Sequence, residues 1–389
     1  MAPSSWTIHN PAGSRRVVVT KELPGEGWLR ILTDADCRVE VSDSKAILAP
    51  DALAEAIGDH CDAVVGQLTE AWRAGLLEKL KAAGGRVYSN YAVGYNNVDV
   101  GAATAFGVPV GTTPGVLTET TAELALALTF AAARRIAEGD AFMREGRFAH
   151  CGWLPTLFLG KLLWRKTLGV VGAGRIGATY ARMMVEGHKM DLVYHDPDSN
   201  EALEAYVRDY GAFLEAHGKP AVTCRRAQSL DELLAAADVV SVHTVLDEST
   251  HHLFGARQFA TMKSDAIFVN SSRGPLHDEH ALVEHCRAHP GFYAALDVFE
   301  DEPRTQPGLS DLPNVVMVPH LGSATGWTRR GMAVLAARNA VAMLDGLPVW
   351  NRPDVLVFLA DDAPAAAPSI INADDLGLPL YQDATEERS

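Results

Sequence analysis

Residues 167–187 read TLGVVGAGRIGATYARMMVEG. An apolar run is followed by three glycines, Gly172, Gly174 and Gly177, and then by apolar residues at helical spacing. The pattern predicts a β-strand, a tight turn and a helix. The first glycine permits the turn, the second lets a phosphate approach the backbone, and the third lets helix and strand pack closely. The free N–H groups at the start of the helix would then hold a diphosphate.

An acidic residue stands at the end of the next predicted strand. Asp196 follows Gly177 by 19 residues. At about this spacing a carboxylate binds the ribose 2′-hydroxyl of NAD and repels the 2′-phosphate of NADP. The turn and Asp196 together predict an NAD site, with NAD preferred over NADP. The neighbouring Arg182, Lys189 and His195 would soften that preference.

The composition is that of a globular protein, which is expected to be soluble. Of the 389 residues, 48% are hydrophobic and 21% charged, and this length allows two domains with their own cores. The net charge of −15 argues against nucleic acid as a partner, because a phosphate-binding surface needs clustered Lys and Arg. No apolar run reaches the roughly 18 residues of a membrane span, so no membrane partner is expected.

Cysteine and histidine usage gives no metal pattern. The five cysteines are scattered without a Cys-x-x-Cys pair, which predicts a reducing compartment and no disulfide framework. The clusters His251–His252 and His277, His280 and His285 are interpreted as surface residues, so no metal is predicted. The first 21 residues lack Asp and Glu, which is weakly typical of a targeting peptide, although RVVVTK at 16–21 favours a first strand.

Short apolar runs alternate with helix-length segments, which is typical of parallel α/β structure. A long apolar helix is expected at about 120–141, and six strands between 167 and 320. These elements predict a dinucleotide-binding domain over 118–320, including the helix and an arm at 120–164. Residues 1–117 and 321–389 would form a discontinuous second domain, with a low-complexity linker at 360–368 and an irregular tail from about 354. The predicted fold is α/β, with two Rossmann-like or flavodoxin-like doubly wound domains and a deep cleft between them.

Ionisable residues follow two of the later strands. Arg273 stands in NSSRGP and His320 in NVVMVPH, with the acidic VFEDEP between them. In open α/β sheets ligands bind outside the carboxyl ends of the strands. There, a guanidinium would hold a 2-oxo acid, and His320 would donate a proton to its carbonyl oxygen. One of Glu300, Asp301 and Glu302 would bond the other ring nitrogen and favour the protonated imidazole; composition does not decide which.

The sequence does not decide the roles of two further segments. AVGYNN at 92–97 presents backbone N–H groups around Gly94, which form either a carboxylate site or a plain turn. GWLPTLFLGKLLW at 152–164 is apolar without clean periodicity. Trp153 and the residues after it either shield a site from water or pack against another subunit.

Longer matches carry a family resemblance. YAVGYNNVD, TPGVLTETTAEL, VVGAGRIG, NSSRGP, LDVFEDEP and VPHLGSAT resemble segments of the D-isomer-specific 2-hydroxyacid dehydrogenases, over about residues 60–345. Within the family, YARMMVEG, GWLP and PSIINADDLGLP resemble the NADH-dependent hydroxypyruvate reductases (glycerate dehydrogenases) of plant photorespiration. This implies reduction of hydroxypyruvate to D-glycerate, and of glyoxylate to glycolate. It also implies Arg273, Glu302 and His320 as catalytic residues, which selects Glu302 among the three acids.

The resemblance implies further contacts and a dimer. Cofactor contacts beyond the glycines fall on Arg175, Ile176, Asp196, Thr244, Val245, Ser271, Ser272, Asp297, Gly322 and Ser323. Substrate contacts fall on Val93 and Gly94, together with Arg273 and His320. Family members are homodimers, which would make residues 152–164 an interface. Plant leaf members end in the peroxisomal signal SKL, whereas this chain ends in EERS, so peroxisome, mitochondrion and cytosol all stay open.

A rival of another class shares these residues. An NADH-sensing transcriptional co-regulator uses the same fold as a binding module, and the three ionisable residues do not exclude it. Other enzymes of the family fit less well, because a phosphoglycerate dehydrogenase often carries a regulatory C-terminal domain and a formate dehydrogenase has Gln as the histidine's partner. NADH oxidation in the presence of hydroxypyruvate separates the enzyme from the co-regulator.

Overall fold

The computed structural model describes residues 5–382 and divides the chain into two compact units. One unit runs to Leu117 and resumes at Ala324; the other spans Thr118–Ser323. The first unit is therefore discontinuous in sequence, and its second boundary falls three residues later than the sequence suggested. Residues 383–389, where the comparison with SKL falls, lie outside the described residues. Within residues 5–382 no helix is long and apolar enough to cross a membrane.

The first unit is a parallel α/β sheet with one antiparallel edge strand. In chain order its elements are β1 (Trp6–His9), β2 (Arg15–Val19), α1 (Gly27–Asp34), β3 (Cys37–Ser42), α2 (Pro50–Ile57), β4 (Ala63–Gly66), α3 (Ala74–Ala82), β5 (Val87–Asn90), α4 (Val100–Ala105), β6 (Val110–Gly111), α13 (Gly326–Leu344) and η3 (Leu356–Leu359). The strand order is β1-β3-β2-β4-β5-β6, and only β1 runs antiparallel to its neighbour. Without β1 this is the flavodoxin-like order.

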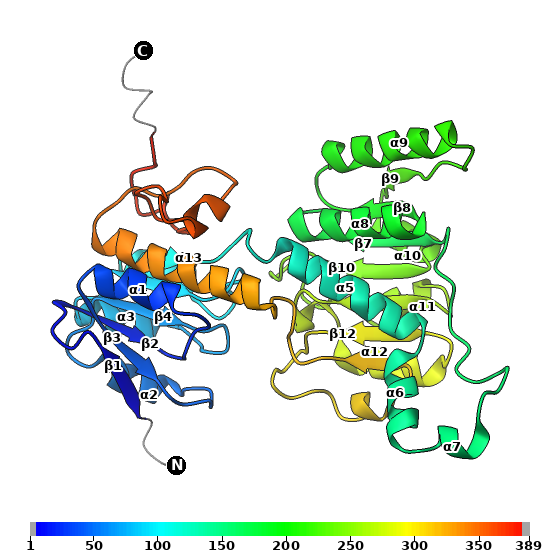
Figure 1. Cartoon of the computed structure of the whole chain (residues 1–389), viewed down its shortest axis with the longest axis horizontal. Coiled ribbons are helices and arrows are strands. Elements are labelled where there is room, and N and C mark those ends of the chain that lie inside the picture. Colours follow the sequence, from blue (N-terminus) through cyan, green and yellow to red (C-terminus); the bar gives the residue numbers. More distant parts are fainter. Residues whose placement is uncertain (1–4, 383–389) are drawn as a thin grey trace. The chain divides into compact units, whose positions relative to one another are not determined.

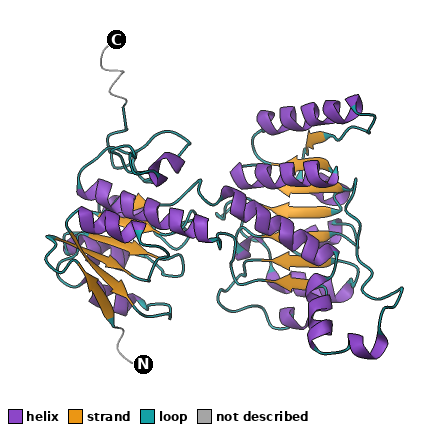
Figure 2. Cartoon of the chain, viewed as in Figure 1, coloured by secondary structure: helices purple, strands orange, loops and turns teal. Residues whose placement is uncertain are grey.

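Helices cover both faces of this sheet (Figure 2). Leu53, Leu77 and Ala103 of α2, α3 and α4 pack with strand residues in one core. On the other face α13 returns from the far end of the chain and lies along α1 (Figure 1). Ser89 of β5 donates to the Ala336 carbonyl of α13 at 2.9 Å. The return of α13 joins the two sequence segments into one unit.

The segment after residue 354 is packed, not a linker. Ala367 is fully buried and Ile370 is 6% exposed, and Ile370 bridges to Gly111 of β6. The backbone N–H of Ile371 donates to the Val110 carbonyl at 2.9 Å. The interpretation of 360–368 as a low-complexity linker was wrong for its last three residues, which are buried, whereas residues 360–362 and 365 are exposed. Irregular backbone there is held by hydrogen bonds instead of by regular secondary structure.

The second unit is a doubly wound parallel sheet. Its elements are α5 (Thr118–Ala133), α6 (Ile136–Arg144), α7 (Phe148–Cys151), β7 (Thr167–Val171), α8 (Arg175–His188), β8 (Asp191–His195), α9 (Glu201–Ala216), β9 (Cys224–Arg226), α10 (Leu230–Ala236), β10 (Val239–Val242), α11 (Ala256–Thr261), β11 (Ile267–Asn270), η1 (Gly274–Leu276), α12 (Glu279–Ala288), β12 (Tyr293–Leu296), η2 (Leu309–Asp311) and β13 (Val315–Met317). The order β13-β12-β11-β10-β7-β8-β9 is the Rossmann order with one added strand. The two doubly wound sheets confirm the predicted α/β class.

The second sheet has seven strands where the sequence predicted six. The additional strand, β9, is three residues long and lies at the sheet edge, with two exposed arginines. Such a strand gives no apolar run for a sequence pattern to detect. It nevertheless places Arg226 beside β8, near a predicted cofactor residue.

Successive strand residues in this unit pack into two separate hydrophobic cores. Val239 packs on the side of α5 and α8, with Tyr180 and Met184, while Val240 packs on the side of α10, α11 and α12. Strands that are buried on both faces are typical of parallel sheets covered by crossover helices. The strands are therefore held rigidly, and their carboxyl ends present fixed loops.

The long helix predicted at 120–141 is broken. Helix α5 ends at Ala133, and α6 begins at Ile136 after Arg135, whose φ is +53°. The Arg135 guanidinium pairs with Glu138 in the first turn of α6. The sequence contains no glycine or proline at the break, so helix propensity alone predicts continuity. The arm at 152–164 exposes large apolar side chains, with Trp153 79% and Leu162 75% exposed.

Candidate functional site

The glycine turn lies where the strand order of the second sheet reverses. Strand β7 pairs with β8 on one side and β10 on the other, and this reversal is where open α/β sheets bind ligands. Gly172 has a φ of +90°, and a Cβ there would lie 2.7 Å from the Thr244 backbone nitrogen. A Cβ on Gly177 would lie 2.0 Å from the Gly172 carbonyl oxygen, whereas one on Gly174 would meet nothing within 4 Å. The turn, the close packing and the open approach predicted for the three glycines are all present.

Helix α8 starts at the open glycine. Gly174 is its N-cap residue, and no side chain caps the helix. Arg175 is exposed and Ile176 half-buried in the first turn. An uncapped helix start with unobstructed backbone N–H groups fits the diphosphate of a dinucleotide.

Asp196 follows β8 and is tied to the same turn. Its carboxylate accepts hydrogen bonds from the backbone N–H of Ala173 at 2.7 Å and of Asp198 at 3.2 Å. Asn200 donates to the Ala173 carbonyl at 2.7 Å, so both sides of the turn are anchored. The Arg226 side chain donates to the Asp196 carbonyl at 3.0 Å. This arginine was missed from sequence because β9 was missed.

The other predicted cofactor residues lie at the carboxyl ends of neighbouring strands. They are Thr244 and Val245 after β10, Ser271 and Ser272 after β11, Asp297 after β12, and Gly322 and Ser323 after β13. Val245 is 71% exposed, and the Ser272 hydroxyl donates to the Thr244 carbonyl at 2.6 Å. The Ser271 hydroxyl is buried and has no hydrogen-bond partner among the described residues. A buried, unsatisfied hydroxyl is suited to a bound polar group.

Asp297 is fully buried and organises the segment that carries His320. Its carboxylate accepts from the backbone N–H groups of Leu321 and Gly322, the latter at 2.8 Å. Its carbonyl accepts from the His320 N–H at 2.9 Å. Burial raises the pKa of Asp297 to about 6, although the two N–H groups and the His320 charge oppose that rise. Both carboxylate oxygens are engaged with this turn, so Asp297 positions His320 and its neighbours.

His320 and Glu302 form a hydrogen-bonded pair. The Nδ1 of His320 lies 2.9 Å from Oε2 of Glu302, and the Phe299 N–H donates to Oε1 at 3.0 Å. Burial opposes ionisation of Glu302, but the hydrogen bond and charge of His320, the Phe299 N–H and the Arg273 charge together lower its pKa. His320 has a φ of +54°, in the left-handed region. The contact with Glu302 settles which of the three acids meets His320.

Arg273 lies beside the loop that carries Glu302. A Cβ on the next residue, Gly274, would lie 1.9 Å from the Phe299 carbonyl oxygen, so only glycine permits this approach. The guanidinium is half-buried and donates to the Ser272 carbonyl at 2.7 Å. Burial lowers the pKa of Arg273, and the Glu302 charge raises it. The structure thus brings Arg273, Glu302 and His320 together at one edge of the sheet.

Val93 and Gly94 lie in the first unit, in the loop after β5. Asn90 donates to the Gly94 carbonyl at 3.1 Å, and the Asn97 amide bonds the Gln67 and Glu70 carbonyls at 3.1 Å each. Val93 and Gly94 are both half-buried. A turn held by the buried Asn90 amide and the half-buried Asn97 amide presents its backbone in one fixed conformation.

Two histidine interpretations were wrong. His285 is half-buried, its ring packs against Phe259 and Phe292, and burial lowers its pKa to about 4. His277 is fully buried, with Nδ1 bonded to the Asn270 amide at 3.0 Å, and burial lowers its pKa to about 4. It follows η1 directly, where the chain turns inward after Arg273, and the polar sequence around it gave no sign of burial. His251 and His280 are exposed as predicted.

Sequence comparison identifies the family. The model of the D-isomer specific 2-hydroxyacid dehydrogenase NAD-binding domain matches residues 126–322. A protein named glycerate dehydrogenase from Cucumis sativus is 55% identical over 96% of this chain and 99% of its own length. A peroxisomal glycerate dehydrogenase from Arabidopsis thaliana is 53% identical over 97% and 98%, and a glyoxylate reductase from Korarchaeum cryptofilum 39% identical over 85% and 93%.

A solved structure agrees with the sequence relatives. The TT0316 protein from Thermus thermophilus superimposes with a TM-score of 0.73, at 38% identity, over 85% of this chain and 97% of that chain. The co-regulator alternative gains no support from these relatives, since the three named for an activity are named as enzymes. This chain belongs to the D-isomer specific 2-hydroxyacid dehydrogenase family and carries its NAD-binding domain.

Proposed function

We propose that this enzyme reduces hydroxypyruvate to D-glycerate with NADH, and glyoxylate to glycolate as a second activity. The observation that carries the proposal is the near-full-length similarity to two glycerate dehydrogenases, combined with the paired His320 and Glu302 beside Arg273. Glyoxylate reductase similarity at lower identity supports the second activity. Both substrates are 2-oxo acids, so one set of groups serves both.

Arg273 is proposed to bind the substrate. The Arg273 guanidinium is planar and permanently charged, and its fork of N–H donors suits the carboxylate and carbonyl oxygens of a 2-oxo acid. Gly274 lets the arginine segment approach Glu302, which helps to offset the cost of burying the cation. In the first unit, the backbone of Val93 and Gly94 is proposed to bind the substrate carboxylate.

The proton donor is proposed to be His320. Its Nδ1 is engaged by Glu302, which leaves Nε2 to give a proton to the carbonyl oxygen and to take it back in the reverse direction. The Glu302 carboxylate fixes the orientation of the imidazole ring. Bound NADH supplies the hydride to the carbonyl carbon. The Asp297 contacts hold the His320 backbone in position while the ring acts.

We propose NADH over NADPH, on the basis of Asp196. A carboxylate at the end of β8 suits two ribose hydroxyls and repels a 2′-phosphate. Arg226, close to the Asp196 backbone, would soften this discrimination, in place of the basic residues weighed from sequence. The cofactor residues after β10, β11, β12 and β13 keep their predicted contacts as part of this proposal.

The proposal extends to assembly and compartment. A homodimer that buries the arm at 152–164 would cover Trp153 and Leu162, which are otherwise exposed. All five cysteines are free, which supports a reducing compartment, either the cytosol or an organelle matrix. One relative is named peroxisomal.

The test is a substrate and cofactor panel. Purified enzyme is assayed for NADH and NADPH oxidation with hydroxypyruvate, glyoxylate and pyruvate, and kcat/KM is compared. The highest value is expected for NADH with hydroxypyruvate. No turnover of either named substrate would refute the proposed function.

A further inference from the structure

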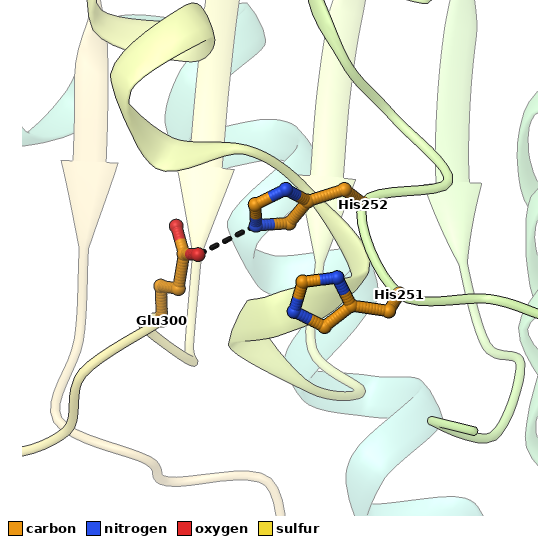
Figure 3. Close-up of side chains that lie close together, drawn as sticks. All are labelled: His251, His252 and Glu300. Carbon is orange, nitrogen blue, oxygen red and sulfur yellow. Dashed lines mark hydrogen bonds and ion pairs between the residues drawn. The ribbon is translucent and has the colours of Figure 1, made fainter. Parts of the chain in front are cut away.

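Three potential metal ligands gather on the surface of the second unit. His251 and His252 lie in the segment after β10, and Glu300 lies in the loop after β12 (Figure 3). One ligand atom from each lies within 4.8 Å of the others. The His252 Nε2 is 2.5 Å from the Glu300 Oε1, and the two imidazole rings stack with centroids 4.1 Å apart and planes 26° apart.

The backbone brings the two rings to the same side. In an extended strand successive side chains point to opposite faces. Here His252 has a φ of +50°, so the chain turns between the two histidines. The His251 N–H donates to the Asp247 carbonyl at 3.0 Å, and the His252 N–H to the Pro275 carbonyl at 2.8 Å. The turn is therefore fixed before any ion arrives.

The carboxylate is supported as well. Glu300 accepts a hydrogen bond on Oε2 from the backbone N–H of Glu279 at 3.2 Å, at the start of helix α12. Its other oxygen faces His252. Ligands that are oriented by outer hydrogen bonds lose less freedom when a metal binds. One oxygen of Glu300 is thus held and the other is available.

The donor set has the chemistry of a transition-metal site. Two imidazole nitrogens and one carboxylate oxygen suit Zn²⁺, whose bonds of about 2.0–2.2 Å place its ligands roughly 3.4 Å apart. Both histidines are exposed, so their rings are free to rotate out of the stack and each point one nitrogen at a shared ion, and water completes the tetrahedron. Mg²⁺ and Ca²⁺ prefer oxygen ligands and fit poorly.

We propose that His251, His252 and Glu300 form a binding site for one Zn²⁺-class divalent ion. On binding, the ring proton of neutral His252 resides on Nδ1, and the His252 Nε2 and the Glu300 Oε1 bond the ion instead of each other. The site is separate from the proton donor: Glu302, two residues further along the loop, keeps its bond to His320. The ion takes no part in hydride or proton transfer.

The test is a direct titration of tag-free, chelator-treated full-length enzyme with Co²⁺, followed by visible absorption. Tetrahedral binding to nitrogen and oxygen ligands gives intense ligand-field bands, and Zn²⁺ should then remove them by competition. One ion per chain is expected, and a hundredfold excess of Mg²⁺ should not compete. Thermal unfolding with and without Zn²⁺ gives a second readout, with an expected rise in Tm.

Substitutions of the proposed ligands, with a control substitution elsewhere, test whether the ion binds at this site. His251→Ala and Glu300→Gln should each weaken binding by at least about tenfold, in keeping with the losses seen when metal sites are altered. His217→Ala, an exposed histidine on another element, should leave binding unchanged. Circular dichroism verifies that each variant is folded.

Either of two outcomes would overturn the site: absence of the Co²⁺ bands, or bands that persist unchanged in His251→Ala and Glu300→Gln. The readouts need no catalysis, so a failed substrate panel leaves this result interpretable.

Discussion

Glu300 and Glu302 lie two residues apart in one loop, and each pairs with a histidine. Glu302 bonds His320 at 2.9 Å, and Glu300 bonds His252 at 2.5 Å. Exposure does not separate them, because the two glutamate side chains are 28% and 29% exposed. The residues around the two pairs differ. The His320 pair lies beside Arg273, whereas the His252 pair lies beside a second imidazole, that of His251.

Because of this difference we propose different functions for the two histidine–carboxylate pairs. A nearby guanidinium suits the first pair to an anionic substrate. A second imidazole suits the other pair to a cation, since imidazole nitrogen is a common metal ligand. Substitutions that treat the two pairs identically should therefore have unequal effects.

The largest difference is expected on removing the rings. His320→Ala should lower kcat/KM for hydroxypyruvate by roughly 10²–10⁴-fold, which is the usual contribution of a general acid. His252→Ala should leave kcat/KM of metal-free enzyme nearly unchanged, because its ring has no place in the proposed reaction. Steady-state NADH oxidation measures both. Equal losses of kcat/KM in the two variants would show that the two histidines do not differ in their role.

A smaller difference is expected on neutralising the acids. Glu302→Gln should lower kcat/KM by about 10–100-fold, because a charge-assisted hydrogen bond is worth roughly 1.5–3 kcal/mol and each 1.4 kcal/mol is tenfold. Glu300→Gln should keep the rate, because Glu300 has no place in the proposed reaction. An unchanged kcat/KM in Glu302→Gln would contradict the role of Glu302.

Part of the site could be predicted from the sequence, and part could not. The glycine turn, Asp196 and the strand-end positions of Arg273 and His320 were predictable, because each depends on local sequence and on the rule for parallel sheets. The family pattern selected Glu302, and its contact with His320 agrees. The pair of His252 and Glu300 was not predictable, because a tertiary contact joins residues 48 positions apart.

The misses in the fold have similar causes. The break at Arg135 follows from a left-handed residue in a sequence with good helix propensity. The tail was interpreted as a linker from its alanines and prolines, yet Ala366 and Ala367 are buried, and Ala367 pairs with Val349 after α13. Strand β9 is too short and polar to give a pattern. In each case tertiary contacts override the local signal.

A third carboxylate, that of Asp297, is expected to change the stability of the fold with pH in the opposite sense to Glu302. Asp297 lies near Glu302, but its pKa is raised from 3.8 to about 6, whereas that of Glu302 is lowered. A carboxyl whose pKa is higher in the folded chain contributes stability at low pH that is lost as pH rises from about 4 to 6. Glu302 contributes in the opposite sense: its stabilisation is present above its unfolded pKa and is lost as pH falls through the lowered value.

The measurement is urea unfolding of wild type, Asp297→Asn and Glu302→Gln between pH 4 and 7. The stability advantage of wild type over Asp297→Asn should shrink by on the order of 1–3 kcal/mol as pH rises through this range. The advantage over Glu302→Gln should stay constant above about pH 5 and begin to fall only as the pH drops below the ordinary glutamate pKa of 4.5. Parallel curves for all three proteins would show that the two carboxyl groups do not titrate as their surroundings predict.

The smallest effect is expected at Asp196, a carboxylate with no histidine partner. It holds the glycine turn through the Ala173 N–H, and it is proposed to bind the ribose. Asp196→Ala should weaken NADH binding by about tenfold, the value of one hydrogen bond to a charged group. It should also raise use of NADPH relative to NADH, because Arg226 would then face a 2′-phosphate without competition. The exposed neighbour Asp198 gives the control, since Asp198→Ala should keep the cofactor ratio. If Asp196→Ala lowers both cofactors equally, Asp196 acts only on the turn, and the preference for NADH has another source.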